Sequence, residues 1–445
     1  MKRVAVIPLL LLISSLTLCA EEEDAELEAL KSQAKELSQR IDAYEKKNSS
    51  DETSLVKDEK KEAGRGYIVD DAQGYNAPMD QKGVLELTGA NSVLSVGGRI
   101  ELHSIYAWPE GAYFAGQIPL DDTGENGQLI MSARDSRLWV KTRTPTEYGP
   151  IRTLIEVDFL GTTATEINTN SHGLRLRHAY LEAAGFTVGQ TNSAFNAFVT
   201  LDTITYPVND TLVRQPLIRY SINNRSLGYD ISFEQPETTL LDQNGTIITP
   251  KDDVAPDIVA RLRYYPLWGE TSVALLGRYI TQDQVTLSDG SRVTSRDAAF
   301  GWGVNMSGKI KLYGLDDIRY DLQYGVGLGR YVAFNAFAAG SIDADGNIQL
   351  QPAYGGHIGY RHWWSQKLRS TLALSYAGTD NHMENVNIDD SNRVTKDVYG
   401  LQLNLLWIPV PNGLVGLEYS KALRSVESGE EGNMDMVTLL VRYDF

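Results

Sequence analysis

The sequence predicts an all-β transmembrane protein, namely a 16-stranded antiparallel outer-membrane β-barrel with an N-terminal coiled-coil helix. Two observations predict the barrel. Strand-length segments recur in which apolar and polar residues alternate, and the gaps between them alternate strictly between long and short. An even strand number, with short turns at one rim and long loops at the other, is typical of barrels that cross the outer membrane. The expected strands cover 92–107, 131–144, 150–160, 173–183, 185–192, 214–222, 226–234, 257–267, 271–282, 298–311, 315–328, 353–364, 368–379, 397–408, 413–424 and 434–445.

The hairpin at 137–159 shows the alternation clearly. Two runs flank a turn at 144–149, and successive side chains of a strand point to opposite faces of a sheet. One face is largely aliphatic, and the other collects Arg137, Trp139, Lys141, Arg143, Arg152, Glu156 and Asp158. In an outer-membrane barrel the apolar face meets lipid and the polar face lines the lumen. We therefore expect a polar interior over the barrel domain, residues 92–445.

The N-terminus predicts export. Lys2 and Arg3 precede an apolar run that ends near Ala20. This run is too short for a membrane span and matches a secretory signal peptide, residues 1–20. Cys19 offers an alternative, lipid attachment, but Leu18 is a poor residue ahead of a lipid-modified cysteine. Cleavage after Ala20 would leave a chain without cysteine, which removes thiolate and disulfide chemistry.

The next segment, 21–47, predicts a helix with a coiled-coil stripe. Apolar residues recur at alternating spacings of three and four, at Leu27, Leu30, Ala34, Leu37, Ile41 and Tyr44. Such an a/d repeat favours association of helices, although a single amphipathic helix on another domain is the alternative. Residues 48–91 form a polar linker and the entry to the barrel. The stripe indicates an oligomer.

Charge gives the first functional indication. The chain carries a net charge of -17, and removal of Lys2 and Arg3 with the signal peptide makes it -19. This excess argues against nucleic acid as a partner. Between Ile130 and Arg225, however, ten Lys and Arg stand against eight Asp and Glu. That local reversal indicates a basic wall inside the barrel.

Several motifs carry a resemblance to a known family. They include the segment Ser95–Tyr106, the run from Ala133 to Leu138, the stretches at 156–159 and 176–180, and the segment Arg214–Tyr220. In this order they resemble the DcaP-like trimeric porins, over nearly the whole mature chain. The resemblance implies a homotrimer in the bacterial outer membrane, in contact with lipid and lipopolysaccharide, with the coiled coil in the periplasm. It also implies passive diffusion of small anionic solutes such as dicarboxylates.

Arginines on the inward faces of neighbouring strands are the candidate selectivity residues. Arg is suited to carboxylates because its planar fork makes bidentate contacts and stays charged. Glu156 and Asp158 would offset part of this field, and the alternative is that they form a structural ion-pair network with Arg137 and Arg177. The candidate pore-lining residues are Arg137, Lys141, Arg152, Glu156, Asp158, Arg175, Arg177, Arg214 and Arg219.

The third long gap, 191–213, is expected to fold into the lumen and narrow it. Its candidate residues are Asp202, Tyr206 and Asp210. Acidic residues that faced the basic wall would create a transverse field across the constriction. The alternative is a loop that covers the trimer interface.

The sequence does not predict an enzyme, a cofactor or a metal centre. The six histidines accompany no nucleophile motif. A loop with Asp343, Asp345 and Asn347 lacks the distal Glu of a calcium site, and we interpret it as a solvated turn. The alternative function is structural, a tethering barrel whose coiled coil engages periplasmic components.

Overall fold

The computed structural model describes residues 35, 84–87, 92–110, 118–120, 127–161, 163–165, 169–206, 208–209, 212–250, 253–283, 286–292, 296–387 and 394–445. The chain divides into two units, Met1–Tyr67 and Ile68–Phe445. In the first unit the structure describes Lys35, which is helical. The predicted signal peptide and the rest of the predicted coiled coil lie outside the described residues. Among the described residues, no helix is long and apolar enough to cross a membrane.

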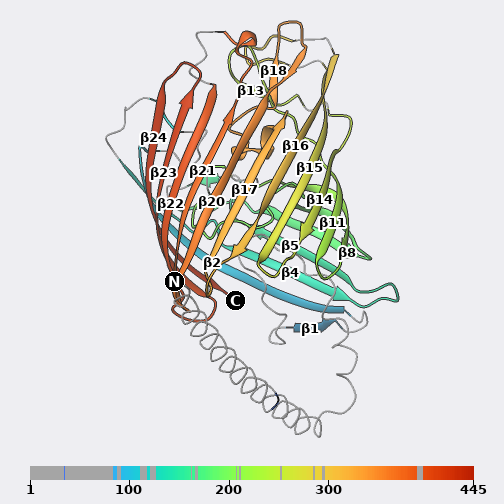
Figure 1. The fold of residues 1–445 in the computed structure, drawn as a ribbon, viewed down its shortest axis with the longest axis vertical. Helices are drawn as coiled ribbons and strands as arrows, with labels where there is room; N and C mark the ends of the chain where they lie inside the picture. The colour runs from blue at the N-terminus through green and yellow to red at the C-terminus, as the bar shows by residue number, and fades with distance from the viewer. Residues whose placement is uncertain are drawn as a thin grey trace, which may run out of the picture. The chain divides into compact units, whose positions relative to one another are not determined.

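One sheet of 18 strands closes into an antiparallel barrel (Figure 1). β3 and β4 pair with successive parts of β2, so together they count as one strand of the barrel wall. β1 (Val84–Leu87) is a short additional strand beside the start of β2. Sixteen positions remain, as the sequence predicts. They are β2 (Ser92–Trp108), β3 (Gln128–Ser132) with β4 (Arg137–Thr144), β5 (Ile151–Asp158), β8 (Arg175–Ala183), β9 (Phe186–Asn192), β10 (Arg214–Asn223), β11 (Leu227–Glu234), β14 (Asp257–Tyr264), β15 (Gly269–Asp283), β16 (Arg296–Lys311), β17 (Asp317–Val326), β20 (Pro352–Ser365), β21 (Leu368–Thr379), β22 (Thr395–Trp407), β23 (Gly413–Val426) and β24 (Glu431–Asp444).

The last strand closes the barrel against the first. β24 pairs with β2 from Arg99 opposite Asp444 to Trp108 opposite Asp435. The backbones of Gly98 and Phe445 then exchange two hydrogen bonds of 2.9 Å. A side chain at Gly98 would collide with the Phe445 ring, so any larger residue would displace this ring. Closure leaves no unpaired sheet edge in the membrane, where water cannot satisfy backbone groups.

The period-two alternation of the sequence sets the two faces of the wall. In β11, Tyr229, Ile231 and Phe233 are exposed on the outside, whereas Asp230 and Glu234 are buried inside. The exposed row forms the apolar surface that lipid covers. The predicted face assignment is therefore confirmed along this strand.

The wall is uneven in length. Strands β4, β5, β8 to β11 and β14 have seven to ten residues each, and we call this part the short wall. Strands β15, β16 and β20 to β24 have twelve to sixteen residues each, and we call this part, together with β17 between them, the long wall. In Figure 1 the longer strands rise further toward the ends that carry the long loops. We call these ends the loop rim and the opposite ends, joined by short turns, the turn rim.

The long loops add structure at the loop rim. A small sheet combines β12 (Leu240–Leu241), β13 (Ile247–Ile248), β18 (Gly340–Ile342) and β19 (Ile348–Leu350), and so connects two loops. Other loops contain the pair β6 (Thr163–Thr165) with β7 (Ser171–His172) and the 3₁₀ turns η3 (Gly329–Tyr331), η4 (Ala333–Asn335) and η5 (Met383–Asn385). These loops leave the barrel wall itself uninterrupted.

The interior is not uniformly polar, which corrects the expectation from sequence. Two loops pack apolar side chains inside the long wall, among them Phe195 after β9 and Tyr331 and Phe337 after β17. Small inward residues of the strands accommodate them, as at Ala353 and Ala377. A loop that enters the lumen must bury its own apolar side chains there, and alternation along the strands does not reveal this.

Candidate functional site

An ion-pair network crosses β4, β5 and β8 on the lumen side. Asp158 accepts two hydrogen bonds from Arg175, at 3.0 and 2.7 Å, and one from Arg177 at 3.0 Å. Glu156 pairs with Arg177 at 2.6 Å and lies 3.5 Å from Arg137. A bulge opposite Glu156 turns Arg177 into the lumen. The predicted network of Arg137, Arg177, Glu156 and Asp158 therefore exists, with Arg175 added to it.

Burial makes this network structural. Asp158 is fully buried and Arg177 is 2% exposed. Removal of one partner from a buried ion pair costs about 3–5 kcal/mol, because the other charge is left without compensation. Arg175 differs, since 42% of its side chain is exposed. Of these three arginines, Arg175 is the one that presents most of its surface to water in the lumen.

An apolar cluster lies below the network, toward the turn rim. Trp139, Leu154 and Tyr180 pack together on β4, β5 and β8. Lys141 follows on the same face of β4, two residues nearer the turn rim. The lumen wall here therefore changes from paired charge to apolar surface and back to positive charge.

A second charged row, which we call the basic belt, lies near the turn rim. It consists of Arg152, Arg219, Arg261 and Arg263, with the carboxylates of Glu182 and Asp230. Arg152 stands opposite Glu182 in the β5–β8 register, and the charges of both Arg219 and Arg152 act on Glu182. Arg152 and Arg219 are partly exposed. The belt thus holds four guanidiniums against two carboxylates.

Asp230 anchors the far end of the belt. It pairs with Arg261 at 2.9 Å and with Arg263 at 2.7 Å, and it accepts a hydrogen bond of 2.6 Å from Ser221. Both arginines of β14 were not predicted, because they lie outside the locally basic stretch that ends at Arg225. Their spacing was the available signal, since Arg261 and Arg263 alternate with Leu262 on an inward face.

Arg214 occupies a different place. It begins β10 at the loop rim, opposite Asn192 of β9, and is partly buried. Arg219, five residues further along β10, lies in the basic belt and donates a hydrogen bond of 3.4 Å to the Asn192 carbonyl oxygen. The structure therefore separates the predicted arginines into an upper network, a lower belt and this rim position.

The segment between β9 and β10, residues 193–213, enters the lumen, and we call it the inner loop. It follows the long wall, and its contacts include those of Phe198 with Ser307, Thr200 with Arg319, Asp202 with Asn404 and Val208 with Ser375. The prediction that this loop folds inward agrees with the geometry. Asp210 lies outside the described residues.

Asp202 does not face the basic belt, which differs from the expected transverse field. Its carboxylate pairs with Arg369 at 2.5 Å and with Arg361 at 3.3 Å, on β21 and β20. Burial alone would raise the pKa of Asp202, but the hydrogen bond from Arg369 and the charges of Arg369, Arg319 and Arg361 lower this pKa to about 2. The pairing stabilises the folded loop above the ordinary pKa of 3.8 and is lost as the pH falls through about 2. Asp202 therefore holds the inner loop in place at neutral pH.

Glu418 of β23 holds the inner loop at a second point. Its buried carboxylate accepts hydrogen bonds from the backbone N–H groups of Ile204 and Thr205, both at 2.7 Å. It also accepts from the Thr205 hydroxyl at 2.6 Å and from the Asn404 amide at 3.1 Å. Buried backbone N–H groups need an acceptor, and this carboxylate provides one for both residues.

A second inserted segment, the η3–η4 loop after β17, was not predicted. Tyr331 donates a hydrogen bond of 2.9 Å to Asp257 and packs edge-on against Phe195 of the inner loop. Arg278 pairs with Asp257 at 3.1 Å and donates to the Gly327 carbonyl oxygen at 2.8 Å. At the tip, Phe334 meets Tyr206 of the inner loop, with ring centroids 5.4 Å apart. The inner loop also contacts the basic belt, because the Arg261 guanidinium lies over the Phe198 ring, 5.6 Å from its centroid.

The loop with Asp343 and Asn347 forms a compact turn. Asp343 accepts hydrogen bonds from the backbone N–H groups of Asp345 and Asn347, at 2.9 and 2.8 Å. Within the described residues, no group of three or more His, Cys, Asp or Glu side chains is placed to hold a metal ion.

Comparisons with known proteins agree on one architecture. A sequence profile described as a porin subfamily matches residues 121–420. The fold is similar to that of the outer membrane channel DcaP of Acinetobacter baumannii, at 20% identity and a TM-score of 0.67, over 81% of this chain and 99% of that chain. It is also similar to OmpT of Vibrio cholerae, at 8% identity and a TM-score of 0.53, over 81% of this chain and 100% of that chain. No curated protein sequence matches.

Proposed function

The chain belongs to the porin subfamily and is an outer-membrane channel, and from that premise we propose that it passes small anions, such as dicarboxylates, by passive diffusion. The basic belt is the observation that carries this proposal. Its four guanidiniums face two carboxylates, so the belt retains positive charge where the wall meets the lumen. Arg137 and Arg177, by contrast, form ion pairs with Glu156 and Asp158, which compensate their charge.

The electric field of the basic belt is strong enough to make the channel prefer anions. At about 4 Å and an effective dielectric near 20, one unit charge interacts with a passing carboxylate by about 4 kcal/mol before desolvation and screening. A quarter of that energy would bias occupancy about fivefold. Diffusion also requires that binding stay weak enough for release, which several spaced arginines achieve better than one tight site.

A reversal-potential measurement tests the proposal. Purified protein in a planar bilayer under a KCl gradient is expected to reverse near the chloride equilibrium potential, and succinate salts are expected to carry current. Reversal near the potassium equilibrium potential would contradict the proposed anion preference. The measurement needs no variant, because the reversal potential reports the ratio of anion to cation permeability directly.

The alternative is a tethering barrel that conducts little. Two loops occupy the lumen beside the long wall, and paired charges fill part of the short wall. Both features narrow the lumen and so support this alternative. The predicted coiled coil, residues 21–47, would then engage periplasmic components. A bilayer that shows no conductance steps would favour this second function over the channel.

We also infer a homotrimer that contacts its copies through the short wall. Seven or eight residues at about 3.3 Å each, tilted by about 40°, span roughly 18–20 Å, which is less than the apolar band of about 25 Å that lipid requires. A neighbouring subunit would shield this wall better than lipid and lipopolysaccharide, which would cover the long wall. Sedimentation of a protein that lacks residues 21–66 should still give a trimer, and a monomer would show that the coiled coil alone holds the assembly.

A further inference from the structure

An aromatic row lies on the outer face of β20, close to the turn rim. Tyr360, His362 and Trp364 alternate along the strand with Arg361 and Trp363, so they share the lipid-facing side of the long wall. The ring centroids of Tyr360 and His362 are 6.2 Å apart, and those of His362 and Trp364 are 4.4 Å apart. Tyr360 is 42% exposed and Trp364 is 63% exposed. The row therefore presents aromatic surface to the outside, where the strands end in short turns.

The carboxylate of Asp316 lies beside this aromatic row. Asp316 precedes the first residue of β17, and β17 pairs with β20. Its carboxylate accepts hydrogen bonds from the Tyr360 hydroxyl at 2.7 Å, from His362 Nδ1 at 2.8 Å and from the Trp363 backbone N–H at 2.9 Å. The hydrogen bonds from His362, the Trp363 backbone and Tyr360 lower the pKa of Asp316 to about 2, so the carboxylate is ionised at neutral pH.

This carboxylate keeps its negative charge and part of its capacity to accept hydrogen bonds. Within the described residues, no lysine or arginine forms an ion pair with Asp316, and neutral His362 donates from Nδ1 without adding charge. A carboxylate offers about four acceptor sites, and the hydroxyl and the two N–H donors leave about one of them. The Asp316 side chain is 17% exposed, so a donor from outside can reach it.

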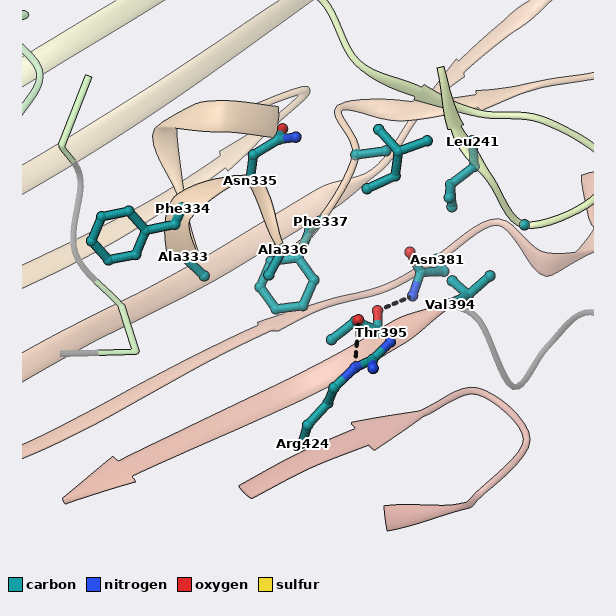
Figure 2. Close-up of a pocket in the computed structure, with 13 residues that line it drawn as sticks. Leu241, Ala333, Phe334, Asn335, Ala336, Phe337, Asn381, Val394, Thr395 and Arg424 are labelled. Atoms are coloured by element: carbon teal, nitrogen blue, oxygen red, sulfur yellow. Dashed lines mark hydrogen bonds between the residues drawn. The ribbon is translucent and has the colours of Figure 1, made fainter. Parts of the chain in front are cut away.

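A cavity of about 380 Å³ at the loop rim is a less suitable site (Figure 2). Its polar side chains bond to groups of the same loops and strands. Arg424 donates to the Thr395 hydroxyl and to the Ile118 carbonyl oxygen, both at 3.0 Å, and Asn381 donates to the Thr395 carbonyl oxygen at 3.0 Å. Asp316 differs, because its remaining acceptor site lies at the outer surface of the barrel.

Exposed apolar side chains place Asp316 at the membrane surface. Leu312, Tyr313 and Leu315 of the same turn are exposed, as is Trp268 of the turn between β14 and β15. The two turns are neighbours, because the Lys311 backbone N–H donates to the Trp268 carbonyl oxygen at 2.7 Å. Aromatic side chains gather at the level of lipid headgroups, and the short turns of outer-membrane barrels lie on the periplasmic side. The carboxylate therefore meets headgroups of the periplasmic leaflet.

We propose that Asp316 and the aromatic row bind the primary ammonium group of a phospholipid, that is, an ethanolamine headgroup. The ammonium would donate an N–H to Asp316 and lie against the ring of Tyr360 or Trp364, because the face of an aromatic ring attracts a cation. A trimethylammonium headgroup has no N–H to donate, and the carboxylate would repel an anionic headgroup. The acyl chains would lie on outward apolar positions further along the wall, such as Ile358 on β20 and Leu372 on β21. The inference concerns the outer face and is independent of the proposed passage of anions.

Native mass spectrometry of the full-length protein in detergent tests the proposal, at about pH 8, where imidazole side chains are mostly neutral. Dioleoyl phosphatidylethanolamine is expected to bind about fivefold more tightly than phosphatidylglycerol or phosphatidylcholine with the same chains, which corresponds to about 1 kcal/mol. Free ethanolamine at the same concentration should not displace the lipid, because it lacks the chains. Displacement by ethanolamine would assign the site to soluble amines and overturn the proposed lipid site.

Three variants identify the residues responsible. Asp316→Asn removes the charge at nearly constant size and should abolish the preference for the ethanolamine headgroup. Glu147→Gln is the matched control, since Glu147 is an exposed carboxylate beside the exposed Tyr148 in another turn of the same rim, and it should keep the preference. Trp364→Leu leaves the hydrogen bonds of Asp316 in place and should weaken binding of the lipid about threefold.

A second readout separates this inference from the proposed function. Asp316 faces outward, so the reversal potential in a KCl gradient should be the same in all three variants as in the unmodified protein, which also shows that the barrel is folded. Equal binding of the three lipids to the unmodified protein would overturn the inference. A preference for phosphatidylethanolamine that survives Asp316→Asn would also overturn it, whichever ion the channel prefers.

Discussion

Replacement of Arg152 and Arg219 together by Glu is expected to turn an anion-preferring channel into a cation-preferring one. Both side chains lie on inward positions of the short wall and are partly exposed to the lumen. The exchange converts the basic belt from four guanidiniums against two carboxylates to two against four. Since each remaining unit charge can bias occupancy about fivefold, the inverted excess should reverse the ratio of permeabilities rather than only reduce it.

The reversal potential in a KCl gradient measures this change directly. Arg152→Lys combined with Arg219→Lys is the matched control, because it keeps the charge and removes only the planar fork; its reversal potential should equal that of the unmodified protein. Transport of succinate should fall sharply in the Glu variant and much less in the Lys variant. A Glu variant that still prefers chloride would show that the belt does not control permeation.

Arg137 and Arg177 are poor choices for the same experiment. Their removal would leave Glu156 and Asp158 buried without full compensation, so loss of folding and change of selectivity would be confounded. From sequence, Arg137 and Arg177 allowed two interpretations, selectivity or pairing with Glu156 and Asp158, because alternation places them on the same inward faces as Arg152 and Arg219. Pairing depends on register and on the bulge beside Glu156, which alternation does not specify.

The strands were predictable because lipid imposes the alternation. Outward positions are mostly apolar, as at Tyr229 and Ile231, and this regularity identifies the strands of the wall. The inner surface obeys no such rule. Asp202 meets Arg369 across 167 residues of sequence, and Glu418 meets Ile204 across 214. Contacts at such separations depend on the path of the inner loop, so the expectation that Asp202 faces the basic wall was wrong even though the inward path of the loop was anticipated.

The second large effect is expected from Glu418→Leu, which removes the carboxylate that holds the inner loop. The backbone N–H groups of Ile204 and Thr205 would lose their acceptor, and the cost of a buried donor without a partner is about 1–3 kcal/mol each. Leu cannot replace those bonds, so we expect the loop to leave the long wall. Single-channel recordings should then show larger current fluctuations and a mean conductance changed by about twofold, with lower thermal stability of the barrel.

Two companion variants identify the cause of that change. Glu270→Leu removes a carboxylate that pairs with Lys309 on the neighbouring strand, and it should leave the conductance unaltered. In the opposite direction, Thr205→Cys with Ser420→Cys can link the loop to β23, because the two hydroxyl oxygens lie 3.0 Å apart. Oxidation of this pair in the Glu418→Leu background should restore steady conductance, and reduction should abolish it again. Quiet, unaltered currents in Glu418→Leu would mean that Asp202 and the apolar contacts of Phe195 hold the inner loop without help from Glu418.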